Sequence, residues 1–161
     1  MNDSDAAQYE PARRLANSAL WAVALQCRRL SWSEPEDDAF VFRRWADFDF
    51  LLVALRRFRR AVGLASPLVP GLQAELDAFD AKLPDLNFLR NVSEHVDDYA
   101  LGRGRDRSVD PKMLQVSTLS DDGPTLSWLI AEDGHSPRSL NASVALAASK
   151  RLFEALQLGR A

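Results

Sequence analysis

The sequence predicts a mainly α-helical fold: a bundle of four to five helices, with a small β-hairpin at about residues 113–130 before the C-terminal helix. Apolar residues recur at three- and four-residue intervals in four stretches, which is the period of helices with one buried face. These stretches are 15–30, 41–62, 72–101 and 144–156. Two β-prone runs surround Asp122-Gly123, a dipeptide typical of tight hairpin turns.

The first helix is expected from about Glu10 to Leu30, because Pro11 suits a first helical position. Cys27 lies on its apolar stripe, so we expect a small core residue and not a catalytic thiol, which would need a basic or polar setting. It is the only cysteine, which excludes an intramolecular disulfide and fits a reducing compartment. We therefore expect a cytoplasmic protein.

The second helix is expected from about Asp38 to Val62, with Asp37 or Asp38 as its cap. Three phenylalanines widen its apolar face beyond a single stripe; they are Phe42, Phe50 and Phe58. An apolar face this wide suggests burial on more than one side, in a bundle or against a second subunit. We therefore expect a homodimer.

A third helical stretch is expected at Leu72–Lys82, and after Pro84 a helix is expected to continue from Leu86 to about Leu101. The following loop begins at Gly102, which follows a helix and so is interpreted as a helix C-cap and turn.

The hairpin interrupts the helical pattern at about 112–131, and residues 132–139 are interpreted as a further loop. Ser139 can cap a last helix over about Leu140 to Leu158. The whole chain, 1–161, fits one domain with this hairpin as an insertion.

Charge and hydropathy exclude several classes of protein. The net charge of −3 does not suggest a general polyanion binder. The acidic N-terminus lacks an apolar stretch, so it is not a signal peptide. No apolar run approaches the roughly 20 residues that a membrane span requires, so we expect no membrane partner.

Arginine dominates the basic residues, since only three of the 20 are lysine. Many of the arginines come in pairs, such as Arg56-Arg57 and Arg59-Arg60. One interpretation is codon bias on solvated helix faces. The other is a phosphate-binding stripe, because arginine makes bidentate contacts with phosphate oxygens.

The chain has two histidines, His95 and His135, too few for a zinc-type Cys/His cluster with a single cysteine. It has no Walker loop and no dinucleotide fingerprint. We therefore expect no cofactor and no metal.

One short constellation carries chemistry: Arg90, Asn91 and His95 in one predicted helix, where Asn91, His95 and Tyr99 would share a face. Metal-free RNA cleavage needs a base, an acid and a cation on the phosphorane. Imidazole can serve as base and acid near pH 7, and arginine as the cation. Arg90 and His95 would point about 140° apart on an ideal helix, which is awkward for joint action within one chain but less so across a two-fold dimer interface.

At these residues the sequence resembles the HEPN superfamily, over about residues 86–100. The motif of that family is an arginine, often followed by a polar residue such as asparagine, and a histidine after a gap of four to six residues. Here four residues separate Arg90 from His95, and Asn91 follows the arginine. The resemblance implies a four- or five-helix bundle, usually dimeric, and a metal-independent RNase of toxin–antitoxin or defence systems. It also implies RNA and a cognate antitoxin, or another protein, as partners.

The sequence departs from that pattern in two ways. Glu94, Asp97 and Asp98 crowd the motif with negative charge, which disfavours RNA nearby. Some family toxins carry a tyrosine two residues after the histidine as a target of AMP transfer, whereas Tyr99 comes four residues after His95.

Three alternatives stay open. Arg90–Glu94 would be an ordinary i,i+4 ion pair, with His95 a satisfied histidine at the edge of the core. The whole chain would then be a non-catalytic module for protein–protein interaction. A small-molecule enzyme using Asp and Glu is the third, although no pair of carboxylates stands out.

Overall fold

The structure is a computed structural model and describes residues 3–32, 40–114, 117–120, 124–128 and 137–159. These residues form six α-helices, one 3-10 helix and three strands. In chain order they are α1 (Asp3–Leu30), α2 (Phe40–Ala65), α3 (Leu72–Lys82), α4 (Leu86–Glu94), α5 (Val96–Ala100), η1 (Pro111–Met113), β1 (Ser117–Ser120), β2 (Thr125–Trp128), β3 (Arg138–Asn141) and α6 (Ala142–Leu158). The predicted fold, mainly helical with a small hairpin before the last helix, is confirmed.

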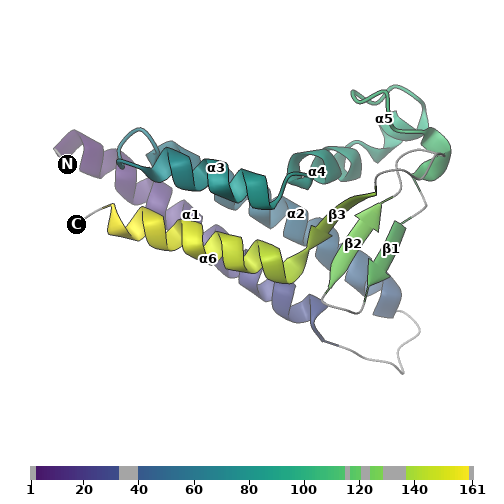
Figure 1. Ribbon diagram of the computed structural model, residues 1–161, viewed down its shortest axis with the longest axis horizontal. Helices are drawn as coiled ribbons and strands as arrows, with labels where there is room; N and C mark the ends of the chain where they lie inside the picture. The colour runs from purple at the N-terminus through teal and green to yellow at the C-terminus, as the bar shows by residue number, and fades with distance from the viewer. Residues whose placement is uncertain (1–2, 33–39, 115–116, 121–123, 129–136, 160–161) are drawn as a thin grey trace.

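The four long helices form the body of the molecule. Figure 1 shows α3 and α6 side by side in front of α1 and α2, with both chain termini at one end. The sheet, α4 and α5 gather toward the other end. The short helices and the sheet are therefore held at one end of a long bundle.

Helix α2 is the centre of the bundle, since it contacts α1, α3, α4 and α6. Its fully buried side chains recur every three or four residues, as a helix with one buried face requires. They include Phe48, Leu51, Leu52, Leu55, Phe58 and Val62. The predicted burial of this stripe is thus confirmed.

Helix α1 begins seven residues before the predicted start, so Pro11 lies inside the helix and not at its first position. The helix extends this far because Tyr9 is fully buried and its hydroxyl donates to the carbonyl of Leu156 in α6, at 2.7 Å. Because Pro11 has no N–H, the carbonyl of Ala7, one turn earlier, lacks its helical hydrogen bond. Both residues are exposed, so water can hydrate that carbonyl.

The wide apolar face predicted for α2 divides into buried and exposed parts. Phe58 is fully buried, whereas Phe42 and Phe50 are 75% and 61% exposed. Buried Asp47 on the same helix is paired with Arg29 of α1 at 2.8 Å. The two exposed phenylalanines therefore lie outside the core of this chain.

The strands form one antiparallel sheet in the order β1-β2-β3. Ser120 pairs with Thr125 at the closed end of the predicted hairpin, and Leu126 pairs with Leu140 of β3. Asp122-Gly123 and the expected cap of the second helix at Asp37 or Asp38 lie outside the described residues.

The start of the last helix was predicted wrongly. Residues 138–141 form the strand β3, whereas the sequence predicts a loop and the first helical turn there. The helix begins at Ala142, and the Asn141 side chain caps it by accepting from the N–H of Val144 at 3.0 Å. Strand pairing of Leu140 with Leu126, both buried, outweighs the helical tendency of Leu140.

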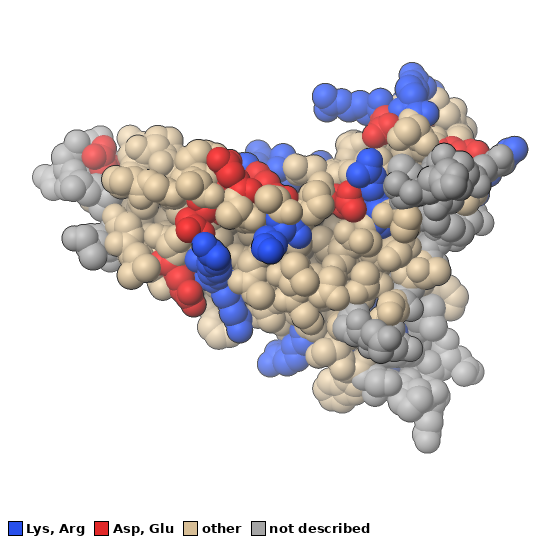
Figure 2. Space-filling model, in the orientation of Figure 1, with Lys and Arg blue, Asp and Glu red and all other residues tan. Residues whose placement is uncertain are grey.

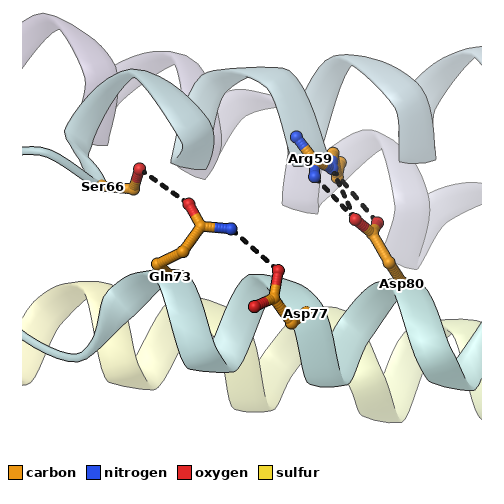
Figure 3. A network of polar contacts seen from close by, with 5 residues as sticks. All are labelled: Arg59, Ser66, Gln73, Asp77 and Asp80. Atoms are coloured by element: carbon orange, nitrogen blue, oxygen red, sulfur yellow. Dashed lines mark hydrogen bonds and ion pairs between the residues drawn. The ribbon is translucent and has the colours of Figure 1, made fainter.

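Polar side chains tie α2 to α3 (Figure 3). Arg59 donates to both carboxylate oxygens of Asp80, with the shortest distance, from Nη2 to Oδ2, at 2.6 Å. Ser66 donates to Gln73 at 3.3 Å, and Gln73 donates to Asp77 at 2.8 Å. Arg59, one of the paired arginines of α2, therefore holds α3 against α2 through Asp80.

Candidate functional site

The predicted helix from Leu86 to about Leu101 breaks at His95. Helix α4 ends at Glu94, and His95 has φ −124° and ψ 34°, outside the helical region. Asn91 and Tyr99 would be about 12 Å apart along an unbroken helix. The break folds α5 back, so that Asn91 Nδ2 donates to Tyr99 Oη at 2.7 Å. The prediction that Asn91, His95 and Tyr99 share one helix face is therefore wrong.

Tyr99 holds this end of the molecule together. It is 2% exposed, and its hydroxyl also accepts from the backbone N–H of Asp106 at 3.3 Å. Gly104 lies so close to the ring that a Cβ there would overlap it. Gly102 has φ +68° and ends α5 as the predicted C-cap, with the Arg103 N–H donating to the Asp98 carbonyl at 2.8 Å. The loop after α5 is thereby wrapped around Tyr99.

A cleft of about 560 Å³ lies between α2, α4 and this loop. Four arginines from three separate segments line it, together with two asparagines, two aromatic rings and a single carboxylate. They are Arg56, Asn87, Phe88, Arg90, Asn91, Tyr99, Arg105, Asp106 and Arg107. We call this feature the arginine cleft.

The charge of the arginine cleft is poorly compensated. Partial burial lowers the pKa of Arg56, and so does the nearby positive charge of Arg59, Arg60 and Arg90. The pKa of Arg59, in contrast, is raised by its hydrogen bonds to Asp80. Within the described part of the chain, Arg56 has no carboxylate partner of that kind. A bound anion would relieve this repulsion between like charges.

The other charged residues of the cleft differ in how many of their polar atoms already have a hydrogen-bond or ion-pair partner. Arg90 forms an ion pair with Glu94, yet its Nε is buried without a hydrogen-bond partner among the described residues. Arg107 donates to the carbonyl of Gly102 at 2.6 Å. Asp106 accepts from the hydroxyl and N–H of Ser108, hydrogen bonds that lower its pKa below the usual 3.8. Asp106 is therefore an anion whose carboxylate is held by hydrogen bonds within its own loop.

The cleft brings together two of the three residues predicted from the sequence. Arg90 and Asn91 line it, while His95 does not and is exposed on the surface at the helix break. The acidic Glu94, Asp97 and Asp98 are not lining residues, although Glu94 pairs with Arg90 and so offsets part of its charge. His135 lies outside the described residues.

Sequence reasoning missed Asn87, Arg105 and Arg107, and it named Arg56 only as one of the paired arginines in the phosphate-stripe interpretation. The available signal was the pairing of arginines in α2 and the alternation of arginine with glycine and aspartate at 102–107. The structure divides the α2 cluster: Arg56 faces the cleft, Arg59 holds α3, and Arg57 and Arg60 line a different groove.

Figure 2 shows where charge gathers on one face of the molecule. Basic side chains project from the end that carries α5, and the surface over α3 and α6 mixes both signs. On that mixed surface Arg151 of α6 pairs with Glu75 of α3 at 3.1 Å. On this face, basic side chains therefore project beyond the surface at the α5 end, where acidic side chains also lie, while pairs of opposite charge mark the surface over α3 and α6.

Cys27, metal-ligating side chains and long apolar helices are the other features that could indicate a function. Cys27 is 7% exposed, and burial raises its pKa to about 11, so the predicted core role is confirmed. No group of three metal-ligating side chains occurs in the described ranges. Within the same ranges, no helix is long and apolar enough to cross a membrane.

Comparison with known proteins identifies no relative: no family model, no curated protein and no solved structure matches the chain. The resemblance of residues 86–100 to the HEPN superfamily therefore stays a prediction. Any function has to be argued from the site itself.

Proposed function

We propose that the arginine cleft binds the phosphodiester backbone of RNA. The single observation that carries the proposal is the convergence of Arg56, Arg90 and the two loop arginines on one cleft with only one carboxylate. Guanidinium groups make bidentate, charge-assisted hydrogen bonds with phosphate oxygens. Asn87 adds an exposed amide, and Phe88 adds an aromatic ring, over which the Arg138 guanidinium lies at 5.2 Å. The cleft thus offers the contacts that a single strand needs.

The proposal extends to metal-independent cleavage by a homodimer. Since His95 does not line the cleft of its own chain, a second copy has to supply it. Val96 follows His95 at the start of α5 and is 47% exposed, and Leu101, which directly follows α5, is 65% exposed. A two-fold dimer that buries them would bring the His95 side chains of both copies together beside the arginine clefts, so that one can act as base and the other as acid. This is the arrangement that the resemblance to HEPN proteins implies.

In this mechanism one imidazole takes the proton of the ribose 2′-OH while the 2′-oxygen bonds to phosphorus. The bond from phosphorus to the 5′-oxygen then breaks, and the imidazolium of the other copy protonates the leaving oxygen. Arg90 carries the charge of the phosphorane. Its guanidinium has five N–H donors, so the ion pair with Glu94 does not use all of them. Asn91, already bonded to Tyr99, positions the wall of the cleft.

Binding is tested by the anisotropy of a labelled single-stranded RNA at several salt concentrations. We expect Arg56→Gln combined with Arg105→Gln to weaken binding about tenfold and to flatten its salt dependence, because two phosphate contacts are lost. Arg14→Gln with Arg28→Gln, on the exposed face of α1, is the matched control for the change in charge. Equal losses in the two double variants would reject the cleft as the RNA site.

Cleavage is tested separately, in EDTA, on the same RNA. We expect products that end in a 2′,3′-cyclic phosphate, no activity in His95→Ala, and a loss of about 10²–10³-fold in Arg90→Ala. His135→Ala is the matched control and should keep full activity. Leu101→Glu should produce monomers that bind RNA but do not cut it. If wild type binds RNA without cutting it, the cleavage step is wrong and the binding step stands.

A second candidate function is the non-catalytic interaction module left open by the sequence. It is supported by an apolar groove between α1 and α2, away from the cleft lining. A role in toxin–antitoxin or defence systems, with a cognate antitoxin as partner, rests on the HEPN resemblance.

A further inference from the structure

A groove of about 560 Å³ runs between α1 and α2, and its described lining comes from these two helices alone. Leu15 of α1 and Phe50 and Leu64 of α2 line it and are each more than half exposed. Between them the lining consists largely of small residues, such as Ala22 and Ala61. Large apolar side chains near the ends and small ones along the floor leave room for a backbone to approach closely.

The dimensions of the groove match a third helix. On α2 it extends from Phe50 to Leu64, which is about 21 Å at the rise of an α-helix. An occupant of about 14 residues, or four turns, would cover that length. A helix satisfies its own backbone hydrogen bonds, whereas an extended strand would bring unpaired N–H and C=O groups against alanines and leucines. An amphipathic helix is therefore the form of chain that fits.

The charge of the groove selects the chemistry of that helix. Arg57 and Arg60 line the α2 side and are exposed, and no carboxylate lies among the described lining residues. Neither arginine has an ion-pair partner within the described part of the chain. Because the two are three residues apart, they lie one turn apart on the same side of α2. They would face acidic side chains along one edge of the occupant.

The same charges argue against a second copy of this chain. A two-fold axis would place the groove of one copy against the groove of the other, since such an interface uses the same patch twice. Four arginines would then meet with no carboxylate from either lining. A flat membrane surface also fits poorly, because the floor of alanines lies between two helices and not on a projecting face.

We propose that the α1–α2 groove binds an amphipathic helix of a different protein, one with an apolar stripe and a row of Asp or Glu along one edge. The inference is independent of the proposed RNA function, since none of the groove residues lines the arginine cleft. It gives the chain two separate faces, one for a phosphate backbone and one for an acidic helix.

The test uses two designed 18-residue helical peptides with the same leucine stripe, one with glutamates and one with lysines along the edge. Fluorescence anisotropy should show that the full-length chain binds the glutamate peptide at least tenfold more tightly than the lysine peptide. Arg57→Glu with Arg60→Glu should reverse that preference. Phe50→Asp should abolish the binding of both peptides. Phe42→Asp, at a still more exposed phenylalanine of α2 outside the groove lining, should leave it intact.

Three outcomes would overturn the proposal. The first is equal or absent binding of the two peptides. The second is a dimer of the wild type in sedimentation that Phe50→Asp converts to a monomer, because a second copy would then fill the groove. The third is binding to phosphatidylserine vesicles that Phe50→Asp removes. Unchanged RNA binding in Phe50→Asp separates a failure of this proposal from a failure of the RNA proposal.

Discussion

The four-helix body and the α4–α5 end are stabilised in different ways. In the body, more than two dozen buried residues form one apolar cluster, which also takes in Leu86 and Leu89 of α4 and a leucine from each of β2 and β3. Buried Asp47 and Ser149 both have polar partners. At the α4–α5 end, the corresponding cluster consists of Val92, Tyr99 and Val109. The first region is held by apolar area, and the second by a few hydrogen bonds around one tyrosine.

The difference matters for function, because the arginine cleft belongs to the weaker region. Repulsion among its guanidinium groups opposes folding, while α2 supplies a rigid wall through Arg56. The loop wall, with Arg105 and Arg107, depends on the packing around Tyr99. A change in the body should therefore unfold the whole chain, and a change at the α4–α5 end should disturb the cleft first.

The largest expected effect is in the body. Leu55 is fully buried at the centre of α2, so Leu55→Ala removes packed methyl groups and leaves a cavity. We expect the free energy of unfolding in urea to fall by about 3 kcal/mol. Leu64→Ala, on the same helix but 62% exposed, is the matched control and should change it by less than about 0.5 kcal/mol. Equal effects would mean that the face of α2 assigned to the core is wrong.

The next effect is at the α4–α5 end. A methyl group at position 104 would overlap the Tyr99 ring, so Gly104→Ala has to displace the ring or the loop. We expect a loss of about 1–3 kcal/mol. Amide hydrogen exchange should speed up around Tyr99 and the loop, and stay slow in α1 and α6. Gly63→Ala in α2 is the control, because a Cβ there meets only the Arg59 side chain, at 3.7 Å. Gly102→Ala cannot serve as the control, because the positive φ of Gly102 would strain an alanine.

The sequence was a good guide to the body, because burial of one helix face leaves a three- and four-residue period. That period located the buried stripe of α2, from Phe48 to Val62. It failed at the start of α1, where the position of Pro11 depends on the burial of Tyr9 against the distant α6. It failed again at β3, whose pairing with β2 is a tertiary contact.

The cleft was harder to predict from the sequence, because its residues come from segments that lie far apart in the chain. Arg90 and Asn91 were found as neighbours in one motif, but Arg56 and Arg105 reach them only through the fold. The break at His95 is invisible to periodicity, because Val92 and Tyr99 are both buried and seven residues apart, as on a continuous helix. A local motif thus predicted one wall of the cleft and misplaced its histidine.

A smaller effect on stability, which depends on pH, is expected from Cys27 in the four-helix body. Burial raises the pKa of Cys27 in the folded chain to about 11, from 9.0 when exposed. Below pH 9 both states hold the thiol proton; between pH 9 and 11 the unfolded state loses it first. Stability should therefore fall as pH rises through that range, by about 1–2 kcal/mol. Cys27→Ala should lack this part of the alkaline loss, and the difference between the two chains at pH 8 and 10.5 isolates it.

The smallest expected effect concerns the pKa of Asp106 in the arginine cleft. The hydrogen bonds that Asp106 accepts from Ser108 lower its folded pKa below 3.8, and the charge of Arg138 acts in the same direction. Since the folded pKa is the lower one, the stabilisation is present above pH 4 and lost as pH falls through the folded pKa. Asp106 is largely solvated, so the effect on stability is slight, and the side-chain carboxyl resonance measured by NMR is the better readout.

Ser108→Ala should move the pKa of that carboxyl up toward 3.8, because it removes the strongest hydrogen bond to the anion. Thr118→Ala, an exposed hydroxyl on β1, is the control and should leave it unchanged. In wild type, Asp106 stays ionised between pH 5 and 8, because its pKa lies below 3.8. Binding of RNA by His95→Ala should accordingly be constant between pH 5 and 8. A pH-dependent affinity in that variant would show that another titrating group faces the cleft.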